Sequence, residues 1–307
     1  MNTNIQHIEM LLAVERAGSI RAASKMLGKT QPAVTKALRQ AEAELGAAIF
    51  KRAPSGVVVT EDGKPILRRA RVIQSELRKM QEEVDQRRGL GTGRLNVTVS
   101  PLAATRLISG TLKRFQRRFP NVHVQISGGH EPIAFGPVRD GQVDIVIGPE
   151  PQAADVAGLS TSFLIETPIS VITGRNSRWV GETRLSELAK GDWLMIGTRA
   201  RLPYLRRHFT KLGLEPPDPK VTSDSIFSVL SLIEESDYLC TYPGRILEQT
   251  AARWRIAALE VDPPLMSARI AVITSSERPP TPALQYFVDC VQQVSSNLFG
   301  PGDAKKL

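Results

Sequence analysis

The chain has 307 residues, long enough for two or three compact domains, and it carries a net charge of +9 from 40 Lys and Arg against 31 Asp and Glu. Such an excess of positive charge indicates a polyanionic partner where the charge is concentrated. Cys240 and Cys290 lack metal-ligand or redox spacing, so we expect no disulfides. The N-terminus has no signal-peptide pattern, and no apolar run reaches about 18 residues. We therefore expect a cytoplasmic protein without membrane spans.

The positive charge is concentrated in the N-terminal third of the chain. Residues 1–93 hold 16 Lys and Arg against 10 Asp and Glu, a net charge of +6. Contacts with nucleic acid are therefore expected in this part of the sequence.

The first 60 residues predict three short helices and a hairpin. An apolar stripe in the first helix ends at Gly18, and Ser19 is placed to cap the second helix. Gly28 permits a tight turn, after which Thr30 caps the third helix and Pro32 lies in its first turn. Two short β-type runs joined across "PSG" then indicate a hairpin.

The third helix carries polar residues along one flank. Gln31, Thr35 and Arg39 follow one another at i, i+4 and i+8, and a helix-turn-helix would place this flank in the major groove of DNA. A solvated helix face would carry the same residue types, so this pattern alone leaves that alternative open. On the DNA-binding interpretation, the contacting residues are Thr30, Gln31, Pro32, Thr35, Lys36 and Arg39 on the helix, with Lys51, Arg52 and Ser55 on the hairpin.

A long helix is predicted over residues 61–88. Its apolar positions alternate by four and three, which is the seam of a coiled coil, and the charged residues on its other faces call for a partner helix. The residues expected to form this dimerisation seam are Ile66, Ala70, Ile73, Leu77, Met80 and Val84. The following "GLGTG" is interpreted as a hinge, so that residues 61–93 form a linker; a phosphate-binding loop would instead follow a strand and open a helix.

From residue 94 onward, apolar strand patterns alternate with helical ones. The runs "RLNVTVS", "VHVQISG", "VDIVIGP", "ISVITG", "WLMIG", "YLCTYP" and "ARIAVITS" predict parallel strands with right-handed crossovers. Two α/β lobes accommodate these strands better than one large sheet. We expect lobe I over about residues 94–165 and 267–300, and lobe II over about 166–266.

The sequence resembles the LysR-type transcriptional regulators over nearly its whole length. The motifs that carry the resemblance are "SIRAASKMLGKTQPAVTKALRQAEAELGAAIFKR", "VVVTEDG", "GRLNVTVSP", "FQRRFPNV" and "DGQVDIVIG". Thr30 and Thr35 replace the family's usual serines and keep the hydroxyl group, while "TEDG" replaces a commoner threonine-x-alanine-glycine. These departures put only the fine specificity for DNA in doubt.

The resemblance implies both a fold and a set of partners. The fold is a winged helix-turn-helix over residues 1–60, a dimerising linker helix, and a two-lobed α/β effector-binding domain over residues 94–307 that is similar to periplasmic binding proteins. The implied partners are double-stranded DNA, a small-molecule effector, further copies of the chain as a homodimer and homotetramer, and RNA polymerase. No cofactor, metal or catalytic residue is expected.

A small molecule is expected where strands end and helices begin. In open α/β sheets, ligands lie beyond the carboxyl ends of strands, against the free N–H groups of helix N-termini. On this argument and on the resemblance, the expected effector-binding residues are Ser100, Pro101, Leu102, Ile147, Pro149, Thr198, Arg199, Thr222 and Ser223. Each serine or threonine has an alternative role as a helix cap. Arg199 and Arg201 favour an anionic effector, although loop arginines are often simply solvated.

Other functions are weaker on sequence grounds. The sequence has four histidines, and no two of them have metal-ligand spacing: His7, His123, His130 and His208. His130 lies beside Glu131. No catalytic motif that couples a nucleophile to a base occurs. A small-molecule-binding protein without a DNA role would leave the basic N-terminal third unexplained. The alternative of a DNA-binding protein whose α/β part only oligomerises, without an effector, remains open at this point. It would hold if side chains filled the cleft between the lobes.

Overall fold

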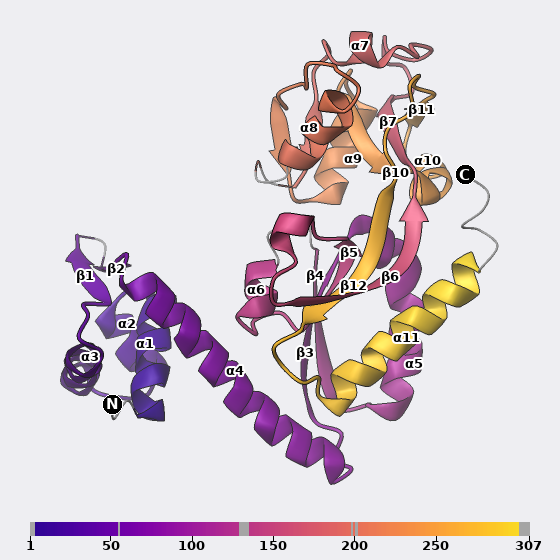
Figure 1. Cartoon of the computed structure of the whole chain (residues 1–307). Coiled ribbons are helices and arrows are strands. Elements are labelled where there is room, and N and C mark those ends of the chain that lie inside the picture. Colours follow the sequence, from indigo (N-terminus) through magenta and orange to yellow (C-terminus); the bar gives the residue numbers. More distant parts are fainter. Residues whose placement is uncertain (1–3, 55, 129–134, 198, 200–201, 301–307) are drawn as a thin grey trace. The chain divides into compact units, whose positions relative to one another are not determined.

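The computed structural model describes residues 4–54, 56–128, 135–197, 199 and 202–300 (Figure 1). The chain divides into two compact units, one of residues 1–82 with 140–142 and the other of residues 83–139 with 143–307, so that one boundary falls inside a long helix, after Glu82. The first unit contains the N-terminal helices and a hairpin, and the second contains two α/β lobes. Among the described residues, every helix is too short or too polar to cross a membrane.

The first unit begins with the three predicted helices: α1 (Ile5–Ala17), α2 (Ile20–Met26) and α3 (Gln31–Leu45). The predicted caps are confirmed, since the Ser19 hydroxyl accepts from the N–H of Ala22 at 3.1 Å and the Thr30 hydroxyl from that of Ala33 at 3.4 Å. Gly18 ends α1 with a φ of 67°, in the left-handed region that glycine tolerates best.

The hairpin is held against α3 by a carboxylate. Strands β1 (Phe50–Ala53) and β2 (Gly56–Val59) pair antiparallel. The Glu42 carboxylate on α3 accepts from the N–H groups of Ile49 at 2.7 Å and Phe50 at 3.1 Å. An ionised acceptor makes each of these bonds stronger than a neutral one, so Glu42 fixes where the hairpin lies beside the helix.

Helix α4 (Gly63–Arg87) starts as part of the first unit's core. Leu67 and Ala70 are buried in the same apolar cluster as Leu11 and Ile49. The Arg71 guanidinium also contacts the Glu15 carboxylate of α1 at 2.7 Å. A Cβ at Gly63 would lie 2.3 Å from the Ile49 carbonyl oxygen, so the glycine of "TEDG" is required by a close backbone approach. The first turns of α4 are therefore fixed to the helix-turn-helix.

Lobe I of the second unit is built on a five-stranded sheet in the order β4-β3-β5-β12-β6. Helices α5 and α11 cover one face and α6 covers the other, giving two separate apolar clusters. The strands are β3 (Gly93–Val99), β4 (Val122–Gly128), β5 (Ile145–Pro149), β6 (Leu159–Thr167) and β12 (Ala268–Ser275). The helical elements are η1 (Ala103–Leu107), α5 (Ile108–Arg118), α6 (Phe135–Arg139), η3 (Ala153–Asp155) and α11 (Pro282–Phe299).

Lobe II carries two small sheets, one in the order β10-β7-β11 and one that pairs β8 with β9. An isolated bridge between Trp193 and Leu239 links them. The strands are β7 (Ile169–Gly174), β8 (Leu194–Ile196), β9 (Val221–Ser223), β10 (Cys240–Pro243) and β11 (Ile256–Leu259). The helical elements are α7 (Leu185–Leu188), α8 (Leu202–Thr210), α9 (Ile226–Glu234), η5 (Gly244–Ile246) and α10 (Leu247–Ala251).

The prediction of parallel strands is right for only part of the second unit. β3 pairs parallel with β4 and β5, and β8 with β9, but the strands β7, β10, β11 and β12 pair antiparallel. An apolar run shows that a strand is covered on both faces and does not fix its direction. β12 returns from lobe II into lobe I, and this reversal makes it antiparallel to β5 and β6.

Candidate functional site

The exposed face of α3 gathers five of the predicted DNA-binding residues around one shallow surface hollow. These residues are Gln31, Pro32, Thr35, Lys36 and Arg39. The opposite face of the helix is anchored in the core by Val34, Leu38 and Ala41, all of which are buried. The periodicity that buries one face of α3 therefore presents the polar flank to solvent.

Hydrogen bonds divide these polar residues into two groups. The Thr30 hydroxyl caps α3, and the Thr35 hydroxyl donates to the Gln31 carbonyl at 2.9 Å. Both threonines thus serve the backbone of the helix. The long side chains of Gln31, Lys36 and Arg39 are exposed and reach furthest from it.

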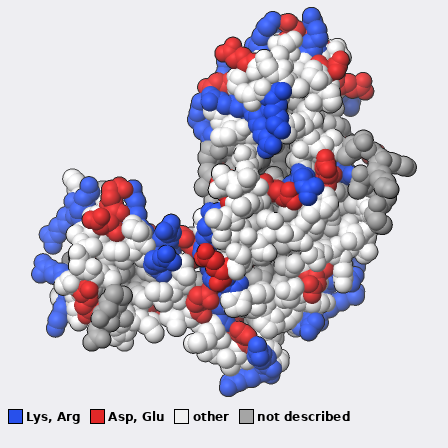
Figure 2. Space-filling view, in the orientation of Figure 1, with Lys and Arg blue, Asp and Glu red and all other residues white. Residues whose placement is uncertain are grey.

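The hairpin adds basic side chains near this face. Lys51 pairs across the strands with Val58, and Arg52 with Val57, and both basic residues are exposed. Figure 2 shows Lys and Arg along the outer edge of the first unit, where α3 and the hairpin lie. The predicted contact at Ser55 lies outside the described residues.

The predicted dimerisation seam of α4 has two parts. Near its start, Ile66 packs against the core of the first unit. Further along, Ile73 is 43% exposed and Met80 62% exposed, Val84 is also exposed, and Leu77 is half-buried. Several large apolar side chains on one charged helix therefore face solvent in the single chain.

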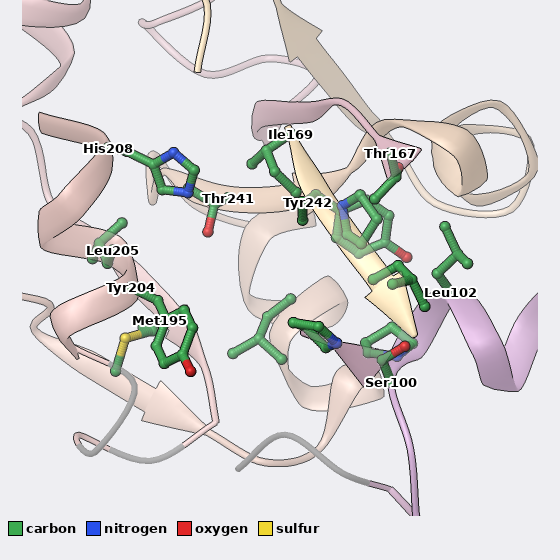
Figure 3. A pocket seen from close by; sticks show the side chains of 16 residues that line it. Ser100, Leu102, Thr167, Ile169, Met195, Tyr204, Leu205, His208, Thr241 and Tyr242 are labelled. Carbon is green, nitrogen blue, oxygen red and sulfur yellow. The ribbon is translucent and has the colours of Figure 1, made fainter. Parts of the chain in front are cut away.

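The second unit contains a cavity of about 130 Å³ beside the strands that connect its lobes (Figure 3). The chain enters lobe II between Thr167 and Ile169 and returns to lobe I at β12, and residues of both crossings line the cavity. The lining residues are Ser100, Pro101, Leu102, Pro149, Thr167, Ile169, Met195, Ile196, Tyr204, Leu205, His208, Thr241, Tyr242, Pro243, Ala268 and Ile270.

Four predicted effector residues lie in this lining: Ser100, Pro101, Leu102 and Pro149. Ser100 follows β3 and is buried, and its hydroxyl accepts from the N–H of Ala103 at 3.4 Å. Its carbonyl accepts from the N–H of Ala104 at 2.8 Å. Pro101 has no N–H group, so the helix start at this corner has fewer donors for a ligand than expected.

The other predicted effector residues lie elsewhere. Ile147 is fully buried in the lobe I sheet. Thr222 is exposed on β9, and the Ser223 hydroxyl accepts from the N–H of Ser225 at 3.2 Å, so it caps a turn. The Arg199 guanidinium is paired with the Asp218 carboxylate at 2.8 Å, and its side chain is 61% exposed. Thr198, Arg201, His130 and Glu131 lie outside the described residues.

Most of the lobe II side of the cavity was missed by the sequence analysis. Thr241 and Tyr242 lie in an apolar strand pattern, which indicates a buried core strand and gives no sign of a binding site. The cavity residues Tyr204, Leu205 and His208 lie in a helix that carries no recognisable motif. The one available signal is the i, i+4 spacing of Tyr204 and His208, which places them on the same face of α8.

Packing inside lobe II fixes the position of α8. Phe209 is buried edge-on against Trp193, with ring centroids 5.3 Å apart, and the Trp193 indole N–H donates to the Leu188 carbonyl at 2.8 Å. His208 precedes Phe209 and faces the cavity. Burial, with the nearby Arg207 charge, lowers the pKa of His208 to about 4, so its imidazole is neutral at physiological pH. Its Nδ1 atom is buried without a hydrogen-bond partner among the described residues.

Both units match known protein families. Residues 5–64 match the bacterial regulatory helix-turn-helix protein, lysR family, and residues 88–296 match the LysR substrate binding domain. The chain belongs to the LysR family. As a LysR-family member, it is a DNA-binding transcriptional regulator with an effector-binding domain.

Curated relatives and solved structures agree with this assignment. The HTH-type transcriptional regulator TdcA of Escherichia coli K12 is 24% identical over 95% of this chain and 93% of its own length. CbbR of Rhizobium meliloti is 24% identical over 93% of this chain and 91% of its own length. A full-length OxyR variant from Pseudomonas aeruginosa has a TM-score of 0.67 at 18% identity, covering 95% of both chains. CbnR, solved in complex with its target DNA, has a TM-score of 0.65 at 21% identity, covering 95% of this chain and 100% of CbnR. The two solved structures show that the LysR fold extends through both units.

In the described part of the chain, no three His, Cys, Asp or Glu side chains come together in a group that could hold a metal ion. Cys240 and Cys290 are buried, and neither forms a disulfide bond. The curated relatives named above are transcriptional regulators.

Proposed function

We propose that this LysR-family regulator reads operator DNA with the exposed face of α3, and that a small molecule in the cavity of the second unit modulates this binding. The observation that carries the proposal is the surface hollow on α3, where Gln31, Lys36 and Arg39 are exposed while the buried face of the helix is packed in the core. Long hydrogen-bonding side chains on a rigid helix are suited to reading base edges in the major groove.

We infer that two such helices act together. The seam at Ile73 and Met80 presents apolar surface to solvent, and a second copy of α4 would cover it. Leu67 and Arg71 fix the start of α4 to the helix-turn-helix, so pairing two copies of α4 would fix the spacing of the two reading helices. A tetramer made from two such dimers, contact with RNA polymerase and operation in the cytoplasm are further parts of the proposal.

The position of the cavity supports an effector role. Its lining includes Thr167 and Ile169 on the outgoing crossing and Ala268 and Ile270 on the returning one. A molecule that bound more tightly to one arrangement of the lobes would shift the population towards that arrangement, by no more than its difference in affinity. DNA contact and effector contact are thus assigned to separate units of the chain.

Replacing Arg39 with alanine should weaken binding to operator DNA about 10- to 100-fold, which corresponds to the ~1–3 kcal/mol of a good base contact. Fluorescence anisotropy with operator and non-operator duplexes at matched salt measures the change. The loss should be greater for the operator, because a base contact carries sequence information and a phosphate contact does not.

Arg88→Ala removes the same chemical group from an exposed position outside the α3 surface, and it should bind operator DNA as the wild type does. Sedimentation of both variants should give the wild-type oligomer mass. Unchanged operator affinity of the Arg39→Ala protein would refute the assignment of this face.

Replacing Ser100 with leucine should abolish the effect of ligand on DNA binding while leaving DNA binding itself intact. The larger side chain would fill part of a cavity of about 130 Å³. The ligands for this experiment are the small aromatic and acidic compounds that stabilise the wild-type protein in a thermal-shift screen. Their dose-response in the DNA-binding assay is then compared between variants.

Ser100→Ala is the matched control, because it removes the same hydroxyl without filling space. It should respond to ligand with at most a modest change in the midpoint concentration. A wild-type dose-response curve from the leucine variant would show that the effector site lies outside this cavity.

A further inference from the structure

The polarity of the cavity in the second unit points to one class of ligand. Among the described residues that line it, there is no Lys, Arg, Asp or Glu. The Arg199 guanidinium is paired with Asp218 and does not line the cavity. Because a carboxylate buried without a cation or several donors is costly, these walls disfavour an anion.

Most of the polar groups in the lining are already occupied. The Tyr242 hydroxyl is 3.0 Å from the Thr250 hydroxyl, so Tyr242 offers its ring to the cavity. The Thr167 hydroxyl donates to the Pro168 carbonyl at 3.2 Å and accepts from the N–H of Arg245 at 3.4 Å. The Ser100 hydroxyl accepts from the N–H of Ala103. A ligand therefore meets mainly aromatic and aliphatic surface.

One pair of polar groups stands apart. His208 and Thr241 both line the cavity, and the Nδ1 atom of His208 is closed off from solvent and has no hydrogen-bond partner among the described residues. Figure 3 shows the His208 ring directed toward Thr241, on the side of the cavity away from Ser100. Because Nδ1 is closed off, the other imidazole nitrogen, Nε2, is the atom that can meet a ligand in the cavity. A ligand hydroxyl that reaches Nε2 and the Thr241 hydroxyl gains hydrogen bonds in an otherwise mainly apolar cavity.

The size of the cavity limits the ligand further. Apolar cavities of about 150 Å³ hold one benzene ring. The present volume of about 130 Å³ is similar, and the rings of Tyr204 and Tyr242 form part of its wall. One aromatic ring with a single small polar substituent fills such a space.

We propose that the cavity takes an uncharged monocyclic aromatic molecule with one hydroxyl group, and that His208 and Thr241 recognise this hydroxyl. The proposal rests on the proposed effector role of the cavity and assigns the chemical class of the effector. A neutral imidazole has one nitrogen that accepts and one that donates, and the threonine hydroxyl can do either. The pair thus matches the donor and acceptor of a phenolic hydroxyl, which keeps its proton at pH 7.

Three probes of similar size test the assignment by calorimetry on the full-length protein at pH 7: phenol, toluene and benzoate. Phenol should bind at least about ten-fold more tightly than toluene, which leaves His208 and Thr241 without a partner. It should also bind at least about ten-fold more tightly than benzoate, whose charge would be buried. Equal or tighter binding of benzoate, or no measurable binding of phenol, would overturn the proposed class.

Thr241→Val and His208→Leu supply the residue-level test. Each variant should weaken phenol binding about ten-fold, as expected for one lost hydrogen bond to a ligand, and should leave toluene binding nearly unchanged. A merely structural role would weaken both probes equally, and that result would contradict recognition of the hydroxyl by this pair. Far-ultraviolet circular dichroism confirms that each variant is folded.

The Ser100→Leu variant separates this inference from the proposed function. If benzoate binds the wild type and not Ser100→Leu, the cavity remains the effector site and only the phenolic class fails. If phenol binds the wild type and Ser100→Leu equally well, the probe occupies another site, and the inference about this cavity is overturned.

Discussion

Glutamate in place of Ile73 or Met80 is expected to convert the regulator into a folded monomer that has lost specific DNA binding. Both side chains are largely exposed in the single chain, at 43% and 62%, so a charge there costs little in the stability of the monomer. In a dimer the same charge would be buried in the seam without a counter-charge. The substitution therefore acts on association and spares folding.

Operator affinity should fall by at least about 100-fold. In a dimer, binding of the first recognition helix holds the second one at a high effective concentration near its own half-site, whereas a monomer contacts one half-site only. Analytical ultracentrifugation measures the mass, and anisotropy measures the affinity. Ile73→Leu and Met80→Leu keep an apolar seam and should remain dimeric and bind normally. Intact dimers of the glutamate variants would remove α4 as the dimerisation element.

The second large effect is expected at Glu42. Its carboxylate accepts from the N–H groups of Ile49 and Phe50, at 2.7 and 3.1 Å, and Ile49 is fully buried. Glu42→Ala would leave two backbone donors unsatisfied, at a cost of about 3 to 4 kcal/mol, given ~1.5–3 kcal/mol for each bond to a charged group and partial rescue by water. The hairpin should then detach from α3, and Lys51 and Arg52 would lose their fixed place beside the reading helix.

Hydrogen exchange followed by mass spectrometry measures this local loss directly. Protection of the peptide that contains Ile49 and Phe50 should fall, while that of the second unit should stay the same. Both N–H groups donate to the same oxygen, Oε1, so the amide oxygen of Glu42→Gln can still accept both bonds, now without a charge. This variant should lose about half as much of the free energy that protects these amides from exchange. Glu44→Ala removes a neighbouring carboxylate on the same helix and should have a small effect. Equal protection in the Glu42→Ala protein would show that the hairpin is held by packing alone.

The sequence predicted the helices of the first unit well because their signals are local. Ser19 and Thr30 each cap a helix through a bond to a backbone N–H three residues later, and such a motif is visible in a few letters. The polar flank of α3 was equally predictable, because the burial of Val34 and Leu38 fixes which side faces solvent. Glu42 was missed, since its partners lie seven and eight residues away and no motif signals them.

The sequence by itself determined the family, the order of the helices and strands, and the apolar seam along α4, because motif spacing and periodicity are properties of neighbouring residues. Only the tertiary structure decided the walls of the cavity. His208 on α8, Thr241 on β10 and Ser100 after β3 lie far apart in the chain, and two crossings between the lobes bring them together. The tertiary structure also paired the Arg199 guanidinium with the Asp218 carboxylate and left Arg199 out of the cavity lining, because a surface ion pair depends on which loops become neighbours.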